Sequence, residues 1–257
     1  MTCAKQAKKT EDKEVGANAP PPSTRLVVAI ALYVFIVLAV DVLALYGERG
    51  FINWRMFQWS PESLWNVVGI SKPRWAYSLP YRQIDLFKFT FWFIIPVAIC
   101  ARHMEWRWFS LRTWKRNDWL LLGIMLVLGG LAVGSIPFIP SLQSTYPGLS
   151  GTNASRNHVY FIAYLLWTAS WLPGWEFMHR YFLLRTVMQR FPRFGWLIVP
   201  LSETIYHLQK PLLEAGGMAA FSLLLTWWTM KRRNMLLPFV AHLYIEILLA
   251  IALVYML

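Results

Sequence analysis

Charged residues are scarce in this chain. Only 15% of its 257 residues are Asp, Glu, Lys or Arg, whereas a soluble domain carries about 25%. Long stretches have almost none: residues 89–100 and 119–142 contain no charge, and residues 26–45 contain only Asp41. A membrane span needs ~20 consecutive apolar residues. The scarcity of charge therefore excludes an ordinary soluble domain and predicts a membrane protein with several spans.

Cysteine is nearly absent as well. The two cysteines are Cys3, in a polar tail, and Cys100, at the end of a predicted span. They are badly placed to pair, so no disulfide framework is expected. A serine-nucleophile signature is also missing, because a serine such as Ser202 in a polar membrane segment is too common to indicate one.

Apolar and aromatic residues are correspondingly abundant. Hydrophobic residues make up 57% of the chain, which also has 15 Trp and 11 Tyr, and amphipathic rings of this kind collect at bilayer interfaces. The net charge is +12, which in a soluble protein would suggest nucleic acid. Here the basic residues flank the apolar blocks, where they set topology, so membrane lipid is the expected partner and nucleic acid is not.

The apolar blocks predict an all-α transmembrane bundle of about seven spans. These are residues 26–46, 84–101, 119–140, 158–184, 195–208, 216–231 and 234–256. Residues 1–25, with four lysines and a run of three prolines, predict a disordered tail. Residues 26–257 then form one membrane domain.

The Lys- and Arg-rich segments predict which way the chain enters the membrane. They lie before the first span and after the second, fourth and sixth spans. Basic segments stay in the cytoplasm, so the N-terminus is predicted to be cytoplasmic. Residues 47–82 carry basic residues on the opposite side, and their four Trp residues favour short pieces lying along the interface.

The fourth predicted span is unusual because Pro173 and Gly174 fall inside it. Proline removes a helical hydrogen bond and kinks a helix. We expect a bend, or two half-helices, immediately before Glu176.

Ionisable residues are concentrated in the last four predicted spans, and several are four residues apart. Residues at this spacing share one helix face and can touch. Three pairs have it: Glu176 with Arg180, Glu203 with His207, and His242 with Glu246. Such pairs can simply tie helices together, at about 0.6 kcal/mol each. Three of them in one part of the chain favour a polar cavity with a function.

Other ionisable residues in the membrane have simpler interpretations. Asp41 and Asp85 are isolated acids near span ends, which indicates a structural role. His179 lies one residue off the face that carries Glu176 and Arg180, so we expect it to pack or to face the interface.

Carboxylates and imidazoles are the groups of general acid–base catalysis. We predict that Arg180 holds Glu176 ionised through its planar fork, and that Glu176 takes a proton from water. The histidines His207 and His242 would contact the water and the oxyanion. Glu203 would orient His207, although Glu203 could also be the base.

Two other classes of function use the same groups. A proton-coupled carrier would use the carboxylates as relay sites, but a carrier is expected to show paired halves, and none is evident. Glu176, His207 and His242 could also form a zinc set. The zinc interpretation is disfavoured because the two histidines lie on different helices, so no cofactor is predicted.

The ordered set of pairs resembles the motifs of the CPBP family (CAAX protease and bacteriocin-processing enzyme, or Abi). Glu176 and Arg180, followed by an apolar run, are similar to its first motif, EExxxR. The Glu203 and His207 pair is similar to the second motif, FxxxH. The last pair, His242 with Glu246, is similar to the third, HxxxN or HxxxD. The resemblance covers residues 158–257.

The resemblance implies an intramembrane glutamic endopeptidase. Trp175 stands where the family has the first Glu of its first motif, and Glu203 stands in place of Phe. A lone Glu after Trp is also similar to the myxosortase-like subgroup of bacterial sorting proteases. This implies a multi-pass protein of the bacterial inner membrane, whose substrate carries a C-terminal sorting signal or leader with a membrane segment. The missing first Glu leaves open a catalytically inactive relative that binds or protects a partner.

Overall fold

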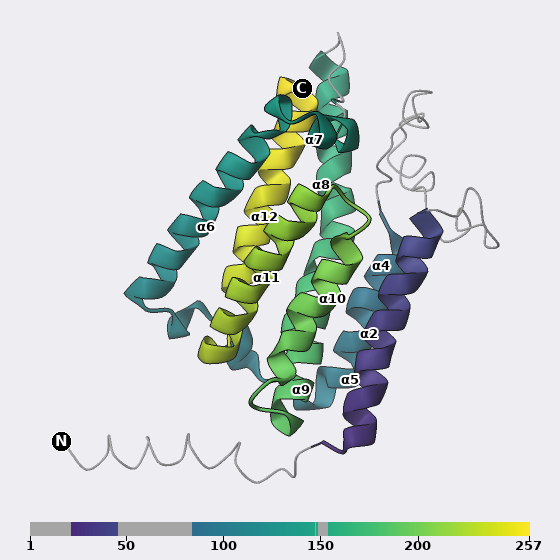
Figure 1. The fold of residues 1–257 in the computed structure, drawn as a ribbon, viewed down its shortest axis with the longest axis vertical. Coiled ribbons are helices and arrows are strands. Elements are labelled where there is room, and N and C mark those ends of the chain that lie inside the picture. The colour runs from purple at the N-terminus through teal and green to yellow at the C-terminus, as the bar shows by residue number, and fades with distance from the viewer. Residues whose placement is uncertain (1–21, 46–83, 147, 149–153) are drawn as a thin grey trace.

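The computed structural model describes residues 22–45, 84–146, 148 and 154–257. Every regular element in these ranges is a helix, as predicted, and none is a strand. Most of the predicted tail (residues 1–21) and the whole predicted interfacial segment (residues 47–82) lie outside the described residues. Figure 1 shows α2 at one edge of the bundle and α6 at the other, with α8 and α10 between them.

The helices follow the predicted apolar blocks closely. The longer elements are α2 (Thr24–Leu45), η4 (Phe89–Ile94) with its neighbours α4 (Leu86–Lys88) and α5 (Ile95–Cys100), α6 (Arg116–Gly134), α8 (Ala154–Phe177), η9 (Met178–Leu183), α9 (Leu184–Arg190), α10 (Ile198–His207), α11 (Leu212–Arg232), α12 (Leu236–Ile251) and η11 (Ala252–Met256). Short turns, among them α7 (Pro140–Thr145), connect them.

Four described helices are long and apolar enough to cross a membrane. They are Thr24–Val42, Leu86–His103, Arg116–Phe138 and Leu236–Met256. Large apolar side chains on α6 point outward: Leu120, Val127 and Leu131 are each about two-thirds exposed. An outward apolar face of this kind suits lipid. The other three predicted spans are also helical but are not among these four.

The helix that contains Pro173 runs on through Glu176, so the prediction of two half-helices is wrong. α8 continues to Phe177, and η9, a π-helix, then continues it to Leu183. A π-helical turn widens the backbone spiral and often occurs at functional sites. The change in helix type therefore falls on the residues around Arg180 rather than before Glu176.

Gly174 has a different role from the one expected of a helix breaker. A Cβ at Gly174 would lie 2.9 Å from the Cβ and 3.0 Å from the carbonyl carbon of Trp92 on η4. The missing side chain therefore allows η4 and α8 to pack with their backbones close together.

We expect Gly174→Ala to lower the thermal stability of the protein. Alanine is favoured over glycine in a helix by about 1 kcal/mol, but here the new methyl group meets backbone and Cβ atoms that have little room to move. Gly123→Ala in α6 is the matched control, because nothing lies within 4 Å of its added Cβ. Unfolding midpoints in lipid nanodiscs should fall for Gly174→Ala and stay level or rise for Gly123→Ala. Equal midpoints for the two variants would contradict the close packing.

Candidate active site

Four of the six predicted site residues form one buried cluster. Glu176 on α8, Arg180 on η9, Glu203 on α10 and His242 on α12 are all at least 93% buried. The helices that carry them contact one another: α12 packs on α8, and η9 packs on α10. The side chains therefore meet in the interior of the bundle, away from its lipid-facing surface.

Arg180 pairs with two carboxylates, and its guanidinium forms the bidentate contact with Glu203 instead of the expected one with Glu176. Its Nη1 and Nη2 atoms lie 2.5 and 3.1 Å from the two oxygens of Glu203. Its contact with Glu176 is a single Nη1–Oε2 distance of 3.3 Å. The predicted fork on Glu176 is therefore wrong. The neighbouring helix supplies the better-aligned carboxylate, and bidentate geometry favours it.

The two oxygens of Glu176 have different surroundings. Oε1 accepts a 2.8 Å hydrogen bond from His242 Nδ1. Oε2 is buried and has no hydrogen-bond donor within the described part of the chain, although Arg180 lies nearby. A buried carboxylate oxygen without a donor carries a desolvation penalty, and water is the smallest group that relieves it.

Glu246 extends this arrangement beyond His242. It lies one helical turn further along α12, with its Oε1 3.9 Å from His242 Nε2. Its other oxygen accepts a 2.8 Å hydrogen bond from the Tyr164 hydroxyl. His242 thus stands between two carboxylates: its Nδ1 donates to Glu176, whereas Glu246 lies beyond hydrogen-bonding distance of its Nε2.

His207 is half-buried at the margin of the cluster. Its Nδ1–H donates to the backbone carbonyl of Glu203 at 2.8 Å. The prediction that the Glu203 carboxylate orients His207 is therefore wrong, because that carboxylate faces Arg180. With Nδ1 as donor, the neutral ring keeps a lone pair on Nε2. No hydrogen bond joins His207 to Glu176 or His242 among the described residues.

Two aromatic rings hold the imidazole of His207. The rings of Trp175 and Tyr206 meet it nearly edge-on, with centroids 5.7 and 5.4 Å away. Trp175 also lies 4.3 Å from the ring of His179. His179 is fully buried, as the packing alternative predicted, and its Nδ1 lies 3.8 Å from a Glu203 oxygen.

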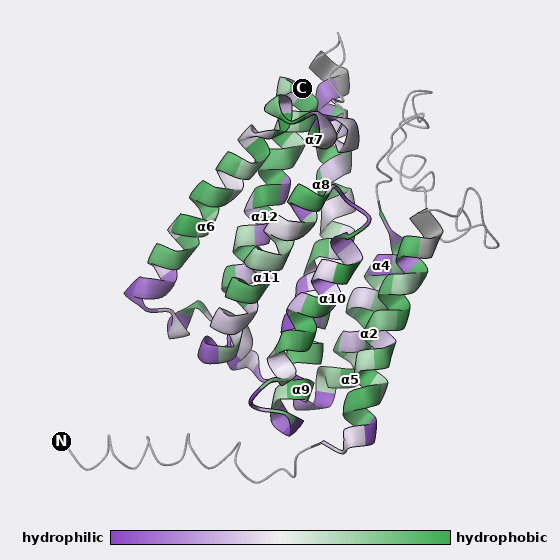
Figure 2. Cartoon of the chain, viewed as in Figure 1, coloured by the Kyte–Doolittle hydropathy of each residue, from purple (hydrophilic) through white to green (hydrophobic). Residues whose placement is uncertain are grey.

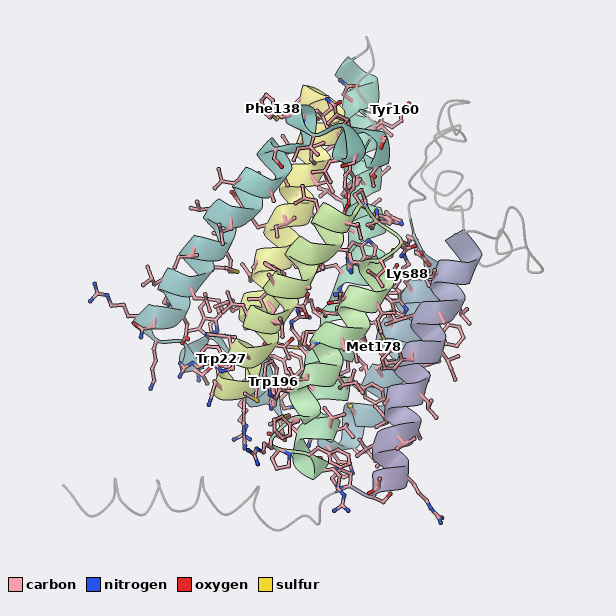
Figure 3. The ribbon with its side chains drawn as sticks, viewed as in Figure 1. Lys88, Phe138, Tyr160, Met178, Trp196 and Trp227 are labelled. Atoms are coloured by element: carbon pink, nitrogen blue, oxygen red, sulfur yellow. The ribbon has the colours of Figure 1, made fainter. Side chains whose placement is uncertain are left out.

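A second buried polar cluster lies beside the first and was not anticipated. Lys88 on α4 lies 3.5 Å from Asp41 on α2 and 3.7 Å from Asp85. The Tyr206 hydroxyl donates to Asp41 at 2.7 Å. Figure 3 shows Lys88 beside α2, in the same part of the bundle. Asp41 and Asp85 are therefore not isolated acids.

The second cluster touches the first through aromatic rings. Lys88 Nζ lies 4.9 Å from the ring centre of Trp92, which in turn packs on Trp175 at 5.4 Å. Tyr206 packs on Trp175 at 5.0 Å. The available sequence signal was Lys88 itself, a cation three residues after Asp85 in an apolar block.

A shared metal site is not evident in the residues that the structure describes. They contain no group of three or more His, Cys, Asp or Glu side chains placed to hold one ion. The zinc set of Glu176, His207 and His242 thus gains no support from the geometry.

No family model matches the chain, and no curated protein or solved structure is similar to it.

Proposed function

We propose that this chain is an intramembrane endopeptidase in which Glu176 activates the water that hydrolyses a peptide bond. The substrate is a membrane-embedded or membrane-proximal peptide with a C-terminal sorting signal or leader. The similarity of the three motifs to the CPBP family supports this proposal. In it, seven helices cross a bacterial inner membrane with the N-terminus in the cytoplasm, and the last four enclose a polar cavity.

One observation carries the proposal more than any other. Glu176 is fully buried; its Oε1 accepts a hydrogen bond from His242, whereas its Oε2 has only an ion-pair contact with Arg180 Nη1, 3.3 Å away, and no hydrogen-bond donor in the described chain. A purely structural buried carboxylate normally has both oxygens satisfied. The remaining oxygen is suited to hold a water molecule and to accept its proton.

The proposed reaction begins when Glu176 Oε2 takes a proton from water. The resulting hydroxide attacks the peptide carbonyl carbon, and the carbonyl oxygen becomes an oxyanion. Two buried N–H groups without partners in the described chain, Arg180 Nε and Trp175 Nε1, are candidates to stabilise it. When the C–N bond breaks, Glu176 returns the proton to the leaving amine, which leaves a carboxylic acid and a free amine.

The histidines act around this step. His242 donates to Glu176 Oε1 and directs the other oxygen toward the water. His207, with its lone pair on Nε2, accepts a hydrogen bond from the water rather than donating to the oxyanion. Glu203 neutralises Arg180 and keeps it in place. Cleavage of a membrane-anchored peptide by the purified chain, and its loss in Glu176→Gln, tests the proposal.

A non-catalytic binding protein is the second candidate. The observation that favours it is Trp175, which occupies the position of the first motif's Glu and fills it with a buried ring. Such a protein would bind its partner equally well with Glu or Gln at position 176.

We expect Tyr206→Phe to lower activity roughly 10- to 100-fold, because displacing His207 by even 1 Å can cost that much. The Tyr206 hydroxyl donates to Asp41, and this bond holds the Tyr206 ring in its place against His207. Tyr33→Phe is the matched control. Tyr33 also joins two helices through one hydroxyl, which donates to the Phe91 carbonyl, but its ring packs on Phe182 instead.

Tyr33→Phe loses a hydrogen bond to a carbonyl, worth about 1 kcal/mol, and Tyr206→Phe loses one to a carboxylate, worth about 1.5–3 kcal/mol. Both unfolding midpoints should therefore fall, that of Tyr206→Phe further. Only Tyr206→Phe should also shift the imidazole NMR signal that disappears in His207→Gln. An unshifted signal in Tyr206→Phe would show that Tyr206 does not position His207.

A further inference from the structure

One end of the bundle is strongly basic. Exposed cations of the described chain at this end include Arg102, Arg107, Arg112, Lys115, Arg116, Arg190, Arg193, Lys231 and Arg233. They lie on the turns between α5 and α6, the end of α9 and the turn between α11 and α12. Figure 2 shows hydrophilic residues gathered at the end of the bundle where α6 begins and α11 ends, whereas α2 and the rest of α6 are mostly hydrophobic.

Two acids among the described residues at this end, Asp118 and Glu105, are already neutralised. Asp118 accepts from Arg232 at 2.5 Å, and Glu105 binds Arg185 at 2.8 Å and Arg107 at 2.7 Å. Burial raises the pKa of Glu105, but the two arginines outweigh burial and hold it below its usual value. Apart from Arg107, these exposed cations therefore have no acidic partner among the described residues and create a positive surface there.

Five of these cations form a preformed surface, because the two turns that carry them are tied together. Arg232 donates to the Thr113 carbonyl at 2.7 Å, and Asn234 donates to the Ser110 carbonyl at 2.7 Å. The Met235 N–H also donates to the Trp108 carbonyl. Around these contacts lie the residues that we name the basic patch: Arg112, Lys115, Arg116, Lys231 and Arg233. None of the five forms an ion pair with a described residue.

Exposed indoles accompany the basic patch. Trp106 is 74% exposed, Trp119 55% and Trp227 46%, and Figure 3 shows Trp227 at the same end of the bundle. Tryptophan side chains favour the headgroup level of a bilayer, where one part of the ring is apolar and the other is hydrated. The indoles thus place the basic patch at the depth of lipid phosphates.

Arg233 adds an independent observation. It is the only non-glycine residue with positive φ among those described, with φ 49° and ψ 51°. Glycine is the usual residue where a helix ends in this left-handed conformation, because a Cβ is disfavoured there. An arginine held in a disfavoured conformation at a surface position suggests a use for its charge.

We propose that the basic patch binds the headgroups of anionic phospholipids. The cations without acidic partners complement the negative charge of the headgroups. The indoles place the patch at the depth of the headgroups in the bilayer. The hydrogen bonds between the two turns hold the cations in place before lipid binds. Each basic residue near a charged membrane surface strengthens binding about fivefold. The patch is independent of the proteolytic site, so it would serve a protease and a binding protein equally.

The test uses the full chain in a neutral detergent, titrated with fluorescent phosphatidylglycerol and, separately, with phosphatidylcholine of the same chain length. We expect tighter binding of phosphatidylglycerol, weakened by added salt. The triple variant Arg112→Gln, Lys115→Gln and Arg116→Gln should lose at least about tenfold in affinity. The double variant Arg112→Lys and Arg116→Lys, which keeps all three positive charges, should bind as the wild type does.

Arg233 provides the sharpest pair of variants. Arg233→Gly relieves the disfavoured conformation, so its unfolding midpoint in phosphatidylcholine nanodiscs should stay level or rise. The same variant should lose affinity for phosphatidylglycerol about fivefold, whereas Arg233→Lys keeps it. Equal affinity for both lipids, unchanged affinity in the triple Gln variant, or competition by inorganic phosphate at the lipid's own concentration would overturn the proposal.

Discussion

Glu176→Gln is expected to abolish peptide cleavage by the reconstituted protein, with a loss of about 10²- to 10⁴-fold. The amide has the size of the carboxylate but cannot accept the proton of water. Arg180 keeps its two contacts with Glu203, so the buried cation stays paired and the fold should survive. Initial rates of product formation and the unfolding midpoint, measured on the same preparation, separate the two effects.

Two further variants test whether the loss of activity is specific to Glu176. Glu105→Gln changes a carboxylate in the turn before α6, away from the cluster, and should keep the wild-type rate. Glu203→Gln weakens the partner of Arg180 and should reduce stability as well as rate. An active Glu176→Gln beside a folded but inactive Glu203→Gln would show that Glu203 is the base.

Arg180→Met is expected to destabilise the protein more than any other single change at the site. It leaves two fully buried carboxylates, Glu176 and Glu203, without their common cation. Removing one partner of a buried ion pair typically costs about 3–5 kcal/mol. We expect a large fall in the unfolding midpoint and a low yield of folded protein after extraction from the membrane.

A double variant separates the loss of charge balance from the loss of packing. Arg180→Met combined with Glu203→Leu removes the pair together, and replacing a whole buried pair with apolar residues is often neutral. Glu176 keeps its bond from His242. The double variant should recover most of the stability of Arg180→Met while staying inactive. If it is no more stable than the single variant, the ion pair does not dominate this region.

The helices could be predicted from the sequence because uncharged runs of this length have few alternatives. The four-residue spacing also predicted correctly that Glu176 and Arg180 come within reach, since residues at that spacing share a helix face. For His242 and Glu246 the same spacing gave only a 3.9 Å approach. For Glu203 and His207 it gave a contact to the backbone instead of the side chain.

Contacts between helices could not be predicted in this way. Spacing along one helix does not show that Arg180 reaches across to Glu203, because that contact depends on how η9 packs on α10. The same holds for Lys88, which meets Asp41 only when α4 and α2 lie side by side. The role of Gly174 also depends on a partner, Trp92, that is distant in the sequence.

The most direct measurement of the central claim is cleavage by the purified chain in proteoliposomes, in water enriched in oxygen-18. A library of membrane-anchored peptides with varied C-terminal and leader segments is incorporated, and the products are identified by mass spectrometry. We predict cleavage that places one oxygen-18 atom in the new carboxyl terminus, with no covalent peptide–protein adduct after acid quenching, and its loss in Glu176→Gln. Cleavage that continues unchanged in Glu176→Gln, or a wild-type chain that binds peptides and cleaves none, would contradict the claim.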